Sequence, residues 1–514
     1  MILSTLFAIA FLIRTFLIHG FVPIFLLICS LVPLIKDKLG NLSSSENYRA
    51  IAISSLFLKI LDWVMILLHG DKLQASDLQF GFSVDNSTTM CTWIATEVIG
   101  YYIRNNKSVY SCLLNLKKAF DQVEFGTLFY KMKQRKFPKI FLRILIFIYI
   151  EQSCRVKWND KFSATFTVRN GVRQGAVLSP TLFSLYIDSL LIKLERSGYG
   201  CHINNYFYGY SAYADDIILL SPTRNGLQNM FNICVEYFKE HKITISTNVD
   251  IKKSKTKCIY FSHTKSNVEP ACILFNNKPL PWVDTWPHLG NELVSQDLSV
   301  KAGSNLKTDL EIKRRKFIGK FHALKQEFGF STPEVLLNLV KIYATSFYGS
   351  VLWNLSGTSA NTLFTSWNSL IRIIWKLPNT SHRYFLEEIS ESSHLKSILS
   401  QRYLGFMHSL IGSKKKCLSE LAKKLMFDQG SISGQNIDYI AKSAGYDRFS
   451  VMNESPRSVA SAIKYAPVSH NSIWKVSFLK ELLNVRDGDL CVGNEEEGFS
   501  KEEIQQLINL VSTD

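Results

Sequence analysis

The chain has 514 residues, of which 46% are apolar and 20% are charged. This apolar content is enough for several packed cores, so composition excludes an intrinsically disordered chain. Lysine and arginine number 59 against 43 acidic residues, a formal net charge of +16, which indicates a polyanionic partner, either nucleic acid or an anionic membrane surface. The ten cysteines form no Cys-x-x-Cys pair and follow no regular spacing, which argues against a zinc site or a disulfide framework and favours buried thiols in a reducing compartment.

The first 35 residues are strongly apolar, with uncharged runs over 1–13 and 21–35. One interpretation is a signal peptide or a membrane span. Neither run reaches the roughly 18 residues that a span needs. No basic residue precedes the first run, and no small-residue cleavage pattern is clear. A membrane role is therefore an alternative that we do not favour.

Apolar spacing then predicts alternating strands and helices along the chain. We expect strands over 47–54, 109–116, 154–158, 163–168 and 258–261, and helices over 56–68, 125–132, 138–150, 182–194 and 227–238. Ser179 and Pro180 are expected to be the N-cap and first residue of the helix that contains 182–194. Residues 306–324 predict a helix with apolar residues on one face and basic residues on the others. Such a helix is typical of a surface that binds a nucleic-acid backbone.

Residues 210–220 read Tyr-Ser-Ala-Tyr-Ala-Asp-Asp-Ile-Ile-Leu-Leu. Two short apolar runs flank adjacent aspartates, Asp215 and Asp216, which predicts a β-hairpin with a charged tip. Ordinary turn chemistry explains an aspartate at such a tip. Two adjacent carboxylates between apolar strands also offer the hard oxygen ligands that a divalent cation prefers.

Three stretches carry a resemblance to a known family. The Tyr-Ala-Asp-Asp sequence of residues 213–216 resembles the palm hairpin of reverse transcriptases. The loop Gly171-Val-Arg-Gln-Gly-Ala-Val-Leu-Ser-Pro180 and the strand Leu113-Leu-Asn-Leu-Lys-Lys-Ala-Phe-Asp121 resemble two further palm motifs, in the family's order. The set resembles the reverse transcriptase region of non-LTR (LINE-type) retrotransposon polyproteins.

The resemblance extends over about residues 18–410 and implies an α+β fold of the right-hand polymerase type, with fingers, palm and thumb and a helical C-terminal region. The implied domains are a reverse transcriptase domain of fingers and palm over 18–290, a thumb-like helical region over 291–375 and a helical region of unknown role over 376–514. Within the last region, Ser500 and Glu503 predict a capping box for a final helix toward Val511.

The implied activity is RNA-directed DNA synthesis by two Mg²⁺ ions about 3.5–4 Å apart, held by three carboxylates. Asp215 and Asp216 match two of them, as catalytic residues and metal ligands. The third position carries Asn115, which offers only a neutral carbonyl. A carboxylate about 4 Å from a divalent ion contributes roughly 8 kcal/mol at an effective dielectric near 20. If about half of this acts as a transition-state effect, its loss slows the reaction by on the order of a thousandfold, which predicts an enzyme that is weakly active or inactive. Asp121 does not replace it, because six residues of strand span roughly 20 Å.

Further roles follow from the resemblance alone. Phe120 matches the aromatic gate that excludes a ribose 2′ hydroxyl, and Arg173, Gln174 and Gly175 match the loop that binds nucleotide and template. Lys255, Lys257, Arg314 and Arg315 are expected to contact the nucleic-acid backbone. The alternatives are a core aromatic for Phe120 and a solvated surface for the basic residues.

The implied partners are an RNA template, a DNA primer and deoxynucleotides, and no protein partner is evident. Residues 18–23 and 31–38 resemble the entry to the fingers, so we favour fingers over a membrane segment, with 1–14 unexplained. A location in the nucleus or cytoplasm is favoured. The resemblance also suggests a copy truncated at its N-terminus, without the family's endonuclease domain. The alternative function is a non-catalytic nucleic-acid-binding remnant of a retrotransposon.

Overall fold

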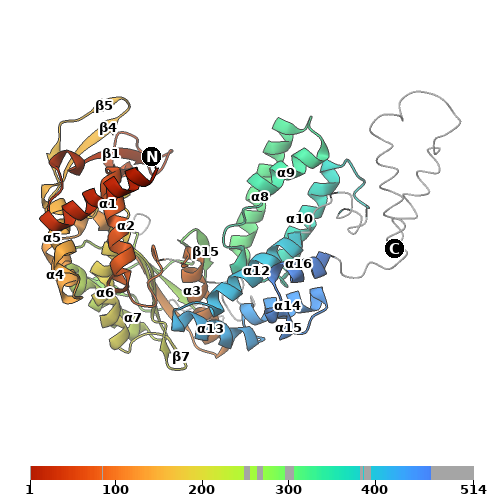
Figure 1. Cartoon of the computed structure of the whole chain (residues 1–514). Helices are drawn as coiled ribbons and strands as arrows, with labels where there is room; N and C mark the ends of the chain where they lie inside the picture. Colours follow the sequence, from red (N-terminus) through yellow and green to blue (C-terminus); the bar gives the residue numbers. More distant parts are fainter. Residues whose placement is uncertain are drawn as a thin grey trace, which may run out of the picture. The chain divides into compact units, whose positions relative to one another are not determined.

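The computed structural model describes residues 2–83, 85–247, 255–262, 270–295, 306–381, 386, 390 and 395–464. The chain forms two compact units, Met1–Asp284 and Thr285–Asp514, which are drawn in Figure 1. The domain limits expected at residues 290 and 375 remain predictions. The helix predicted from Ser500 toward Val511 lies outside the described residues.

The first unit begins with a sheet in which β1 (Ile28–Ile35) is central. β1 pairs antiparallel with β2 (Tyr48–Ile53) and parallel with β4 (Ser153–Trp158). Two short strands pair with β4, namely β5 (Lys161–Phe162) and β6 (Phe166–Thr167). Of the strand predicted over 163–168, only β6 forms, and residues 163–165 carry no strand. The alternating pattern there therefore predicted a longer strand than the structure has.

Helices pack beside this sheet (Figure 1). The unexplained N-terminal stretch is helix α1 (Ile2–His19), which packs on α5 (Lys139–Glu151). Arg143 of α5 donates a hydrogen bond of 2.5 Å to the Ile18 carbonyl, which satisfies an acceptor at the end of α1 that the helix itself leaves open. Other helical segments of this unit are α2 (Leu56–His69), α4 (Phe125–Gln134) and the short 3₁₀ turns η1 (Ile24–Leu27), η2 (Ser45–Asn47), η3 (Gly70–Leu73) and η4 (Ala119–Gln122).

The second sheet of this unit has the strand order β11-β3-β10-β9. These strands are β3 (Val109–Leu114), β9 (Tyr210–Tyr213), β10 (Asp216–Ser221) and β11 (Lys257–Phe261), all antiparallel to their neighbours. Two helices pack against this sheet, α3 (Thr88–Arg104) and α7 (Arg224–Glu240), and α6 (Ser179–Arg196) packs on α7. Residues 217–220 of β10 are all buried, so the sheet is covered on both faces.

Small hairpins and a second, mainly helical unit complete the chain. The hairpins of the first unit are β7 (His202–Ile203) with β8 (Tyr206–Phe207) and β12 (Leu274–Phe275) with β13 (Lys278–Pro279). The second unit contains β14 (Thr285–His288), β15 (Asn291–Val294), α8 (Lys307–Phe328), α9 (Pro333–Tyr343), η6 (Ser350–Leu352), α10 (Thr358–Ile374), α12 (Leu395–Ile411), α13 (Lys416–Phe427), α14 (Ile432–Ala444), α15 (Ser450–Asn453) and α16 (Pro456–Lys464). Leu310, Phe317 and Phe321 are buried on one face of α8, as the sequence predicted.

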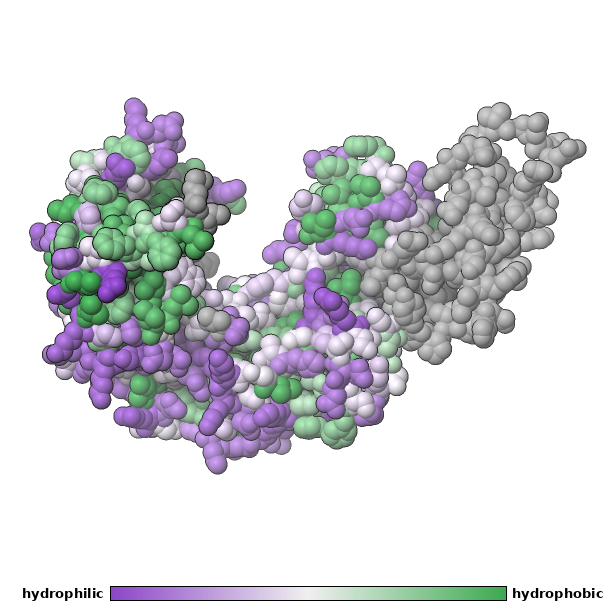
Figure 2. Space-filling model, in the orientation of Figure 1, coloured by the Kyte–Doolittle hydropathy of each residue, from purple (hydrophilic) through white to green (hydrophobic). Residues whose placement is uncertain are grey.

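The outer face of α1 is apolar, and Figure 2 shows green surface in the region where α1 and α5 lie in Figure 1. Leu3, Phe7 and Phe11 are 72%, 74% and 73% exposed, while Ile13 and Phe16 point into the core. Within the described part of the chain, none of the helices combines the length and the hydropathy needed to cross a membrane.

Candidate active site in the palm hairpin

The charged tip predicted at Asp215 and Asp216 is a two-residue hairpin turn. Tyr213 at the end of β9 pairs with Asp216 at the start of β10, so Ala214 and Asp215 form the turn. Ala214 has a φ of +56°, the left-handed region that two-residue hairpin turns require at their first central position. Glycine usually occupies such a position because a Cβ is disfavoured there, so the alanine marks a turn that its surroundings must hold.

The two carboxylates are crowded into one electrostatic environment. Burial raises the pKa of Asp215, which is half-buried. The Asp216 side chain is accessible to solvent yet closely surrounded by protein, and this burial, together with the charge of Asp215, raises its pKa to about 6. Arg49 of β2 is the positive group that opposes both shifts. The two desolvated carboxylates repel each other, and one cation opposes this repulsion. A bound divalent metal would reduce it further, and carboxylate oxygens are suitable ligands for such an ion.

Asn115 lies beside this pair. Leu114 and Ile217 are partners in the β3–β10 ladder, so the next position along β3 puts Asn115 opposite Asp216. The backbone of Asn115 is fixed from two sides, because its N–H donates to Thr256 Oγ1 (3.2 Å) and its carbonyl accepts from the Ser246 N–H (2.7 Å). The register therefore brings together the three positions that the sequence singled out.

The donor set fits a cation only in part. Among the described residues no group of three or more histidine, cysteine, aspartate or glutamate side chains is arranged to hold a metal ion. Asp215 and Asp216 supply two carboxylates, and the amide of Asn115 supplies no charge. The residues present thus suit one shared cation better than the two ions expected of the family.

The loop that begins at Gly171 connects β2 of the first sheet with η4, the turn that contains Phe120. The Val172 N–H donates to the Phe120 carbonyl (2.8 Å), and the Gln174 carbonyl accepts from the Ala52 N–H of β2 (2.6 Å). Gly175 has a φ of +111°, and a Cβ there would meet the Ala52 carbonyl oxygen at 2.8 Å. A glycine is therefore required at residue 175 for the close approach of loop and strand.

Phe120 belongs to a cluster of aromatic rings that reaches the hairpin. Its ring stacks on Phe183 of α6, with centroids 4.7 Å apart, and lies edge-on to Phe82 at 6.5 Å. Phe82 in turn contacts Tyr213 of β9 at 5.8 Å. Phe120 is half-buried, so one part of the ring packs and another part faces outward, which is compatible with either role considered for it.

Arg173 has a different environment from the one expected for a phosphate contact. It is only 6% exposed and lies 5.4 Å from the centre of the Tyr149 ring. Burial raises the pKa of Asp62, and the charge of Arg173 opposes this rise. In the described structure Arg173 therefore ties α2, α5 and the loop together, and a nucleotide contact would require it to leave these partners.

The basic residues assigned to the nucleic-acid backbone are not equivalent. Lys255 is exposed and close enough to Lys36 to lower the pKa of that residue, although burial lowers it more, while Lys257 in β11 is half-buried. Arg314 and Arg315 of α8 both bond to Glu311, at 2.8 Å and 3.2 Å. Of these two, Arg315 is 76% exposed and keeps most of its charge available to solvent.

Three residues near the hairpin were not assigned a role from the sequence. Arg49 is the cation nearest in electrostatic effect to the aspartates, Phe82 links Phe120 to Tyr213, and Gln79 bonds directly to the hairpin turn. The available signal was a glutamine in an otherwise apolar stretch, Leu78 to Phe82, because a polar residue in such a run is buried only with partners.

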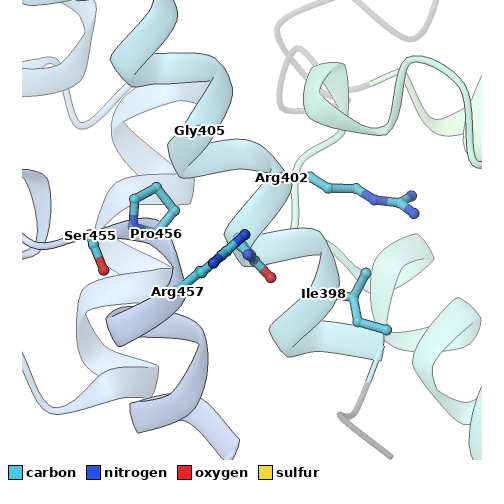
Figure 3. Close-up of a pocket in the computed structure, with 7 residues that line it drawn as sticks. Ile398, Arg402, Gly405, Ser455, Pro456 and Arg457 are labelled. Atoms are coloured by element: carbon cyan, nitrogen blue, oxygen red, sulfur yellow. The ribbon is translucent and has the colours of Figure 1, made fainter.

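A separate pocket lies wholly in the second unit, between α12 and the start of α16 (Figure 3). Its volume is about 580 Å³ and its lining is Ile398, Gln401, Arg402, Gly405, Ser455, Pro456 and Arg457. Arg402 donates a hydrogen bond to the Thr345 carbonyl (3.1 Å), so part of its guanidinium is already hydrogen-bonded within the protein. The pocket contains none of the palm motifs and is not the catalytic site.

Comparison with known proteins identifies the family of residues 36–290. Residues 36–290 match the family model "Reverse transcriptase (RNA-dependent DNA polymerase)". The chain is 25% identical over 250 residues to the Pol polyprotein of the type-2 retrotransposable element R2DM of Drosophila melanogaster, and 28% identical over 182 residues to the R2 Pol polyprotein of Nasonia vitripennis. These matches cover 48% and 35% of this chain but only 23% and 18% of those polyproteins.

Solved structures are more distant. Telomerase from Candida albicans, in complex with a fragment of telomeric RNA, is 10% identical with a TM-score of 0.40, over 84% of this chain and 65% of that one. Apo telomerase from Candida tropicalis is 12% identical with a TM-score of 0.39, over 87% and 68%. Because these scores are low, the α+β polymerase fold is assigned from the observed strands and helices and from the family match. Residues 36–290 of this chain are therefore a reverse transcriptase region of the non-LTR retrotransposon type.

Proposed function

We propose that the chain is the RNA-directed DNA polymerase part of a retroelement polyprotein and that Asn115 makes it weakly active or inactive. The observation that carries the proposal is the position of Asn115, which directly follows the last β3 residue paired with β10 and so lies beside Asp216 and near the strained turn that contains Asp215. Two divalent ions, when bound at such a site, supply activation of the primer 3′ hydroxyl and stabilisation of the leaving pyrophosphate. Asp215 and Asp216 would hold the one cation that their two carboxylates can share.

The other residues would bind and orient. Arg49, whose charge is felt by both aspartates, is suited to the triphosphate of an incoming deoxynucleotide. Gln174 and Gly175 lie on the loop that connects β2 with η4 and would support the nucleotide and the template base. Phe120 would select deoxyribose. Lys255, Lys257, Arg314 and Arg315 would contact the backbones of the RNA template and the DNA primer.

The defect has a direct physical cause. In a complete site three carboxylates balance the charge of the metal ions, whereas here one ligand is a neutral amide. The remaining pair must carry the whole charge, and the transition state gains less stabilisation than it would from three. A location in which RNA and deoxynucleotides occur together, the nucleus or cytoplasm, follows from this function.

The decisive experiment is primer extension on a poly(rA) template with Mg²⁺. We would compare the unmodified chain, Asn115→Asp and the double variant Asn115→Asp, Asp215→Asn. A gain of at least about a hundredfold from Asn115→Asp, abolished by Asp215→Asn, would support the proposal. Efficient extension by the unmodified chain would contradict the predicted defect, and extension by none of the variants would contradict the polymerase itself.

A non-catalytic nucleic-acid binder is the second candidate, favoured by the same asparagine. It predicts that the unmodified chain binds an RNA–DNA hybrid with an affinity that falls steeply with salt concentration and that Asn115→Asp gives no extension. Equal binding with restored extension would favour the first candidate.

A further inference from the structure

The hairpin that carries Asp215 is hydrogen-bonded to a segment far away in the sequence, Leu78 to Gly81. The Ala212 N–H donates to the Leu78 carbonyl (2.9 Å), and the Phe80 N–H donates to the Ala212 carbonyl (2.8 Å). Gln79 and Ala212 thus form a parallel bridge at the outer edge of β9. The segment covers the edge of the sheet beside the catalytic turn.

The side chain of Gln79 completes the attachment. Gln79 is fully buried, and its Oε1 accepts hydrogen bonds from the Ala214 N–H and the Gly81 N–H, each 2.9 Å long. Its Nε2 donates a longer bond, 3.4 Å, to the Ala214 carbonyl. One side chain therefore contacts both polar backbone groups of the residue that begins the turn.

This attachment explains how an alanine occupies a left-handed conformation. The φ of +56° at Ala214 is disfavoured for any residue with a Cβ, so the turn persists only where its surroundings hold it. Gly81 is part of the same arrangement, because a Cβ there would lie 2.4 Å from the Ala214 nitrogen. Gln79 and Gly81 together fit the turn closely, one by bonding to it and one by leaving space.

We infer that Gln79 is a positioning residue for the metal-binding carboxylates. By fixing both backbone groups of Ala214, it sets the direction in which the chain enters Asp215 and Asp216, and so the relative placement of their carboxylates. The inference rests on the proposed function for its catalytic consequence. Because Gln79 is fully buried and bonds to the turn, its loss should lower kcat and weaken metal use while leaving substrate binding in place.

The chain offers a matched control for a buried glutamine. Gln152 is also fully buried, but neither polar atom of its side chain bonds to any of the described residues. Gln79→Met and Gln152→Met make the same chemical change, and only the first leaves the N–H groups of Ala214 and Gly81 without an acceptor. Both would be made in the Asn115→Asp chain.

Three readouts test the inference. Relative to Gln152→Met, we expect Gln79→Met to lower kcat for primer extension by about tenfold or more, with KM for deoxynucleotide and Kd for the template–primer changed less than about threefold. The Mg²⁺ concentration for half-maximal rate should rise. Amide hydrogen exchange at Ala214 should accelerate by roughly tenfold or more.

The outcomes separate this inference from the proposed function. If Asn115→Asp does not extend primers, the proposed function fails, and Ala214 exchange in the unmodified chain and in Gln79→Met still decides whether the attachment exists. If Gln79→Met does not fold, slow Ala214 exchange in the unmodified chain supports the attachment and fast exchange overturns it. Unchanged kcat and unchanged Ala214 exchange in a folded Gln79→Met chain would overturn the inference.

Discussion

Asn115 and Asp216 face each other across the β3–β10 ladder, one position beyond the Leu114–Ile217 pair. This relationship puts the one neutral member of the predicted metal site next to a carboxylate whose pKa is raised to about 6 by burial and by Asp215. The sequence identified both residues, and the register now gives them a common location. The consequences of changing Asn115 are therefore local and can be measured without assaying activity.

Asn115→Asp should make the stability of the protein depend on Mg²⁺. A third carboxylate adds repulsion to Asp215 and Asp216, so without metal the variant should unfold at a lower temperature than the unmodified chain. Metal binding to the folded state should reverse this, by about 2.7 kcal/mol at a metal concentration of about 100 times Kd. Thermal unfolding with EDTA and with Mg²⁺ measures both effects.

Asp215→Asn in the same background is the control for this Mg²⁺ effect. It restores two carboxylates and should remove most of the added stabilisation by metal. If Mg²⁺ stabilises the unmodified chain and Asn115→Asp equally, the residue at 115 does not reach the metal, and the ladder argument is wrong.

Phe120→Val, made in the Asn115→Asp chain, should lower discrimination against ribonucleotides by at least about tenfold. The exposed part of the ring would otherwise occupy the space that a 2′ hydroxyl needs. Competition between deoxynucleotides and ribonucleotides in primer extension measures the ratio of kcat/KM. Phe166→Val, a change of an exposed aromatic in β6, is the control. Unchanged discrimination would assign Phe120 to packing against Phe183 alone.

Periodicity predicted the elements that surround the site. Residues 47–54, 56–68 and 227–238 were expected as a strand and two helices, and the structure has β2, α2 and α7 there. In 227–238 the apolar residues recur on one helical face, so the pattern there is informative. The helix α6, in contrast, starts at Ser179 with Leu178 in the cap position, one residue earlier than expected. The prediction of Ser179 as N-cap was wrong, because the loop already turns at Leu178.

The parts of the site that sequence did not predict depend on tertiary contacts. Helix α1 is apolar on nearly every side, so it has no period that distinguishes a packed helix from a membrane segment. Arg173 was assigned from its motif, yet burial beside Tyr149 and Asp62 depends on α2 and α5. Gln79 lies more than 130 residues from the turn it holds, and no local pattern links the two.

Asp309→Asn should destabilise the second unit by on the order of 3 kcal/mol. Asp309 is 1% exposed, bonds to Lys313 at 2.9 Å and accepts from Trp353 Nε1 at 2.9 Å. The asparagine keeps an acceptor for the indole but leaves the largely buried Lys313 cation without its carboxylate. Urea unfolding measures the loss.

Two further variants test the assignment of this loss to the buried charge. Adding Lys313→Met to Asp309→Asn should recover more than half of the loss, since no uncompensated charge then remains. Glu420→Gln, in a pair with Lys423 where both side chains are about half exposed, should change stability by less than about 1 kcal/mol. No recovery in the double variant would show that the loss does not come from the uncompensated charge of Lys313.

His288 should make the second unit less stable in mild acid. Burial lowers the pKa of this histidine to about 4, from its ordinary value of 6.5. In the unfolded chain the imidazole binds a proton below about pH 6.5, whereas in the folded chain it stays neutral until about pH 4, so acid favours unfolding between these values. From pH 7 to pH 5 the free energy of unfolding should fall by on the order of 2 kcal/mol more than in His288→Gln. Urea unfolding of both proteins across this range measures the difference, and parallel pH profiles would show that His288 does not titrate as its burial predicts.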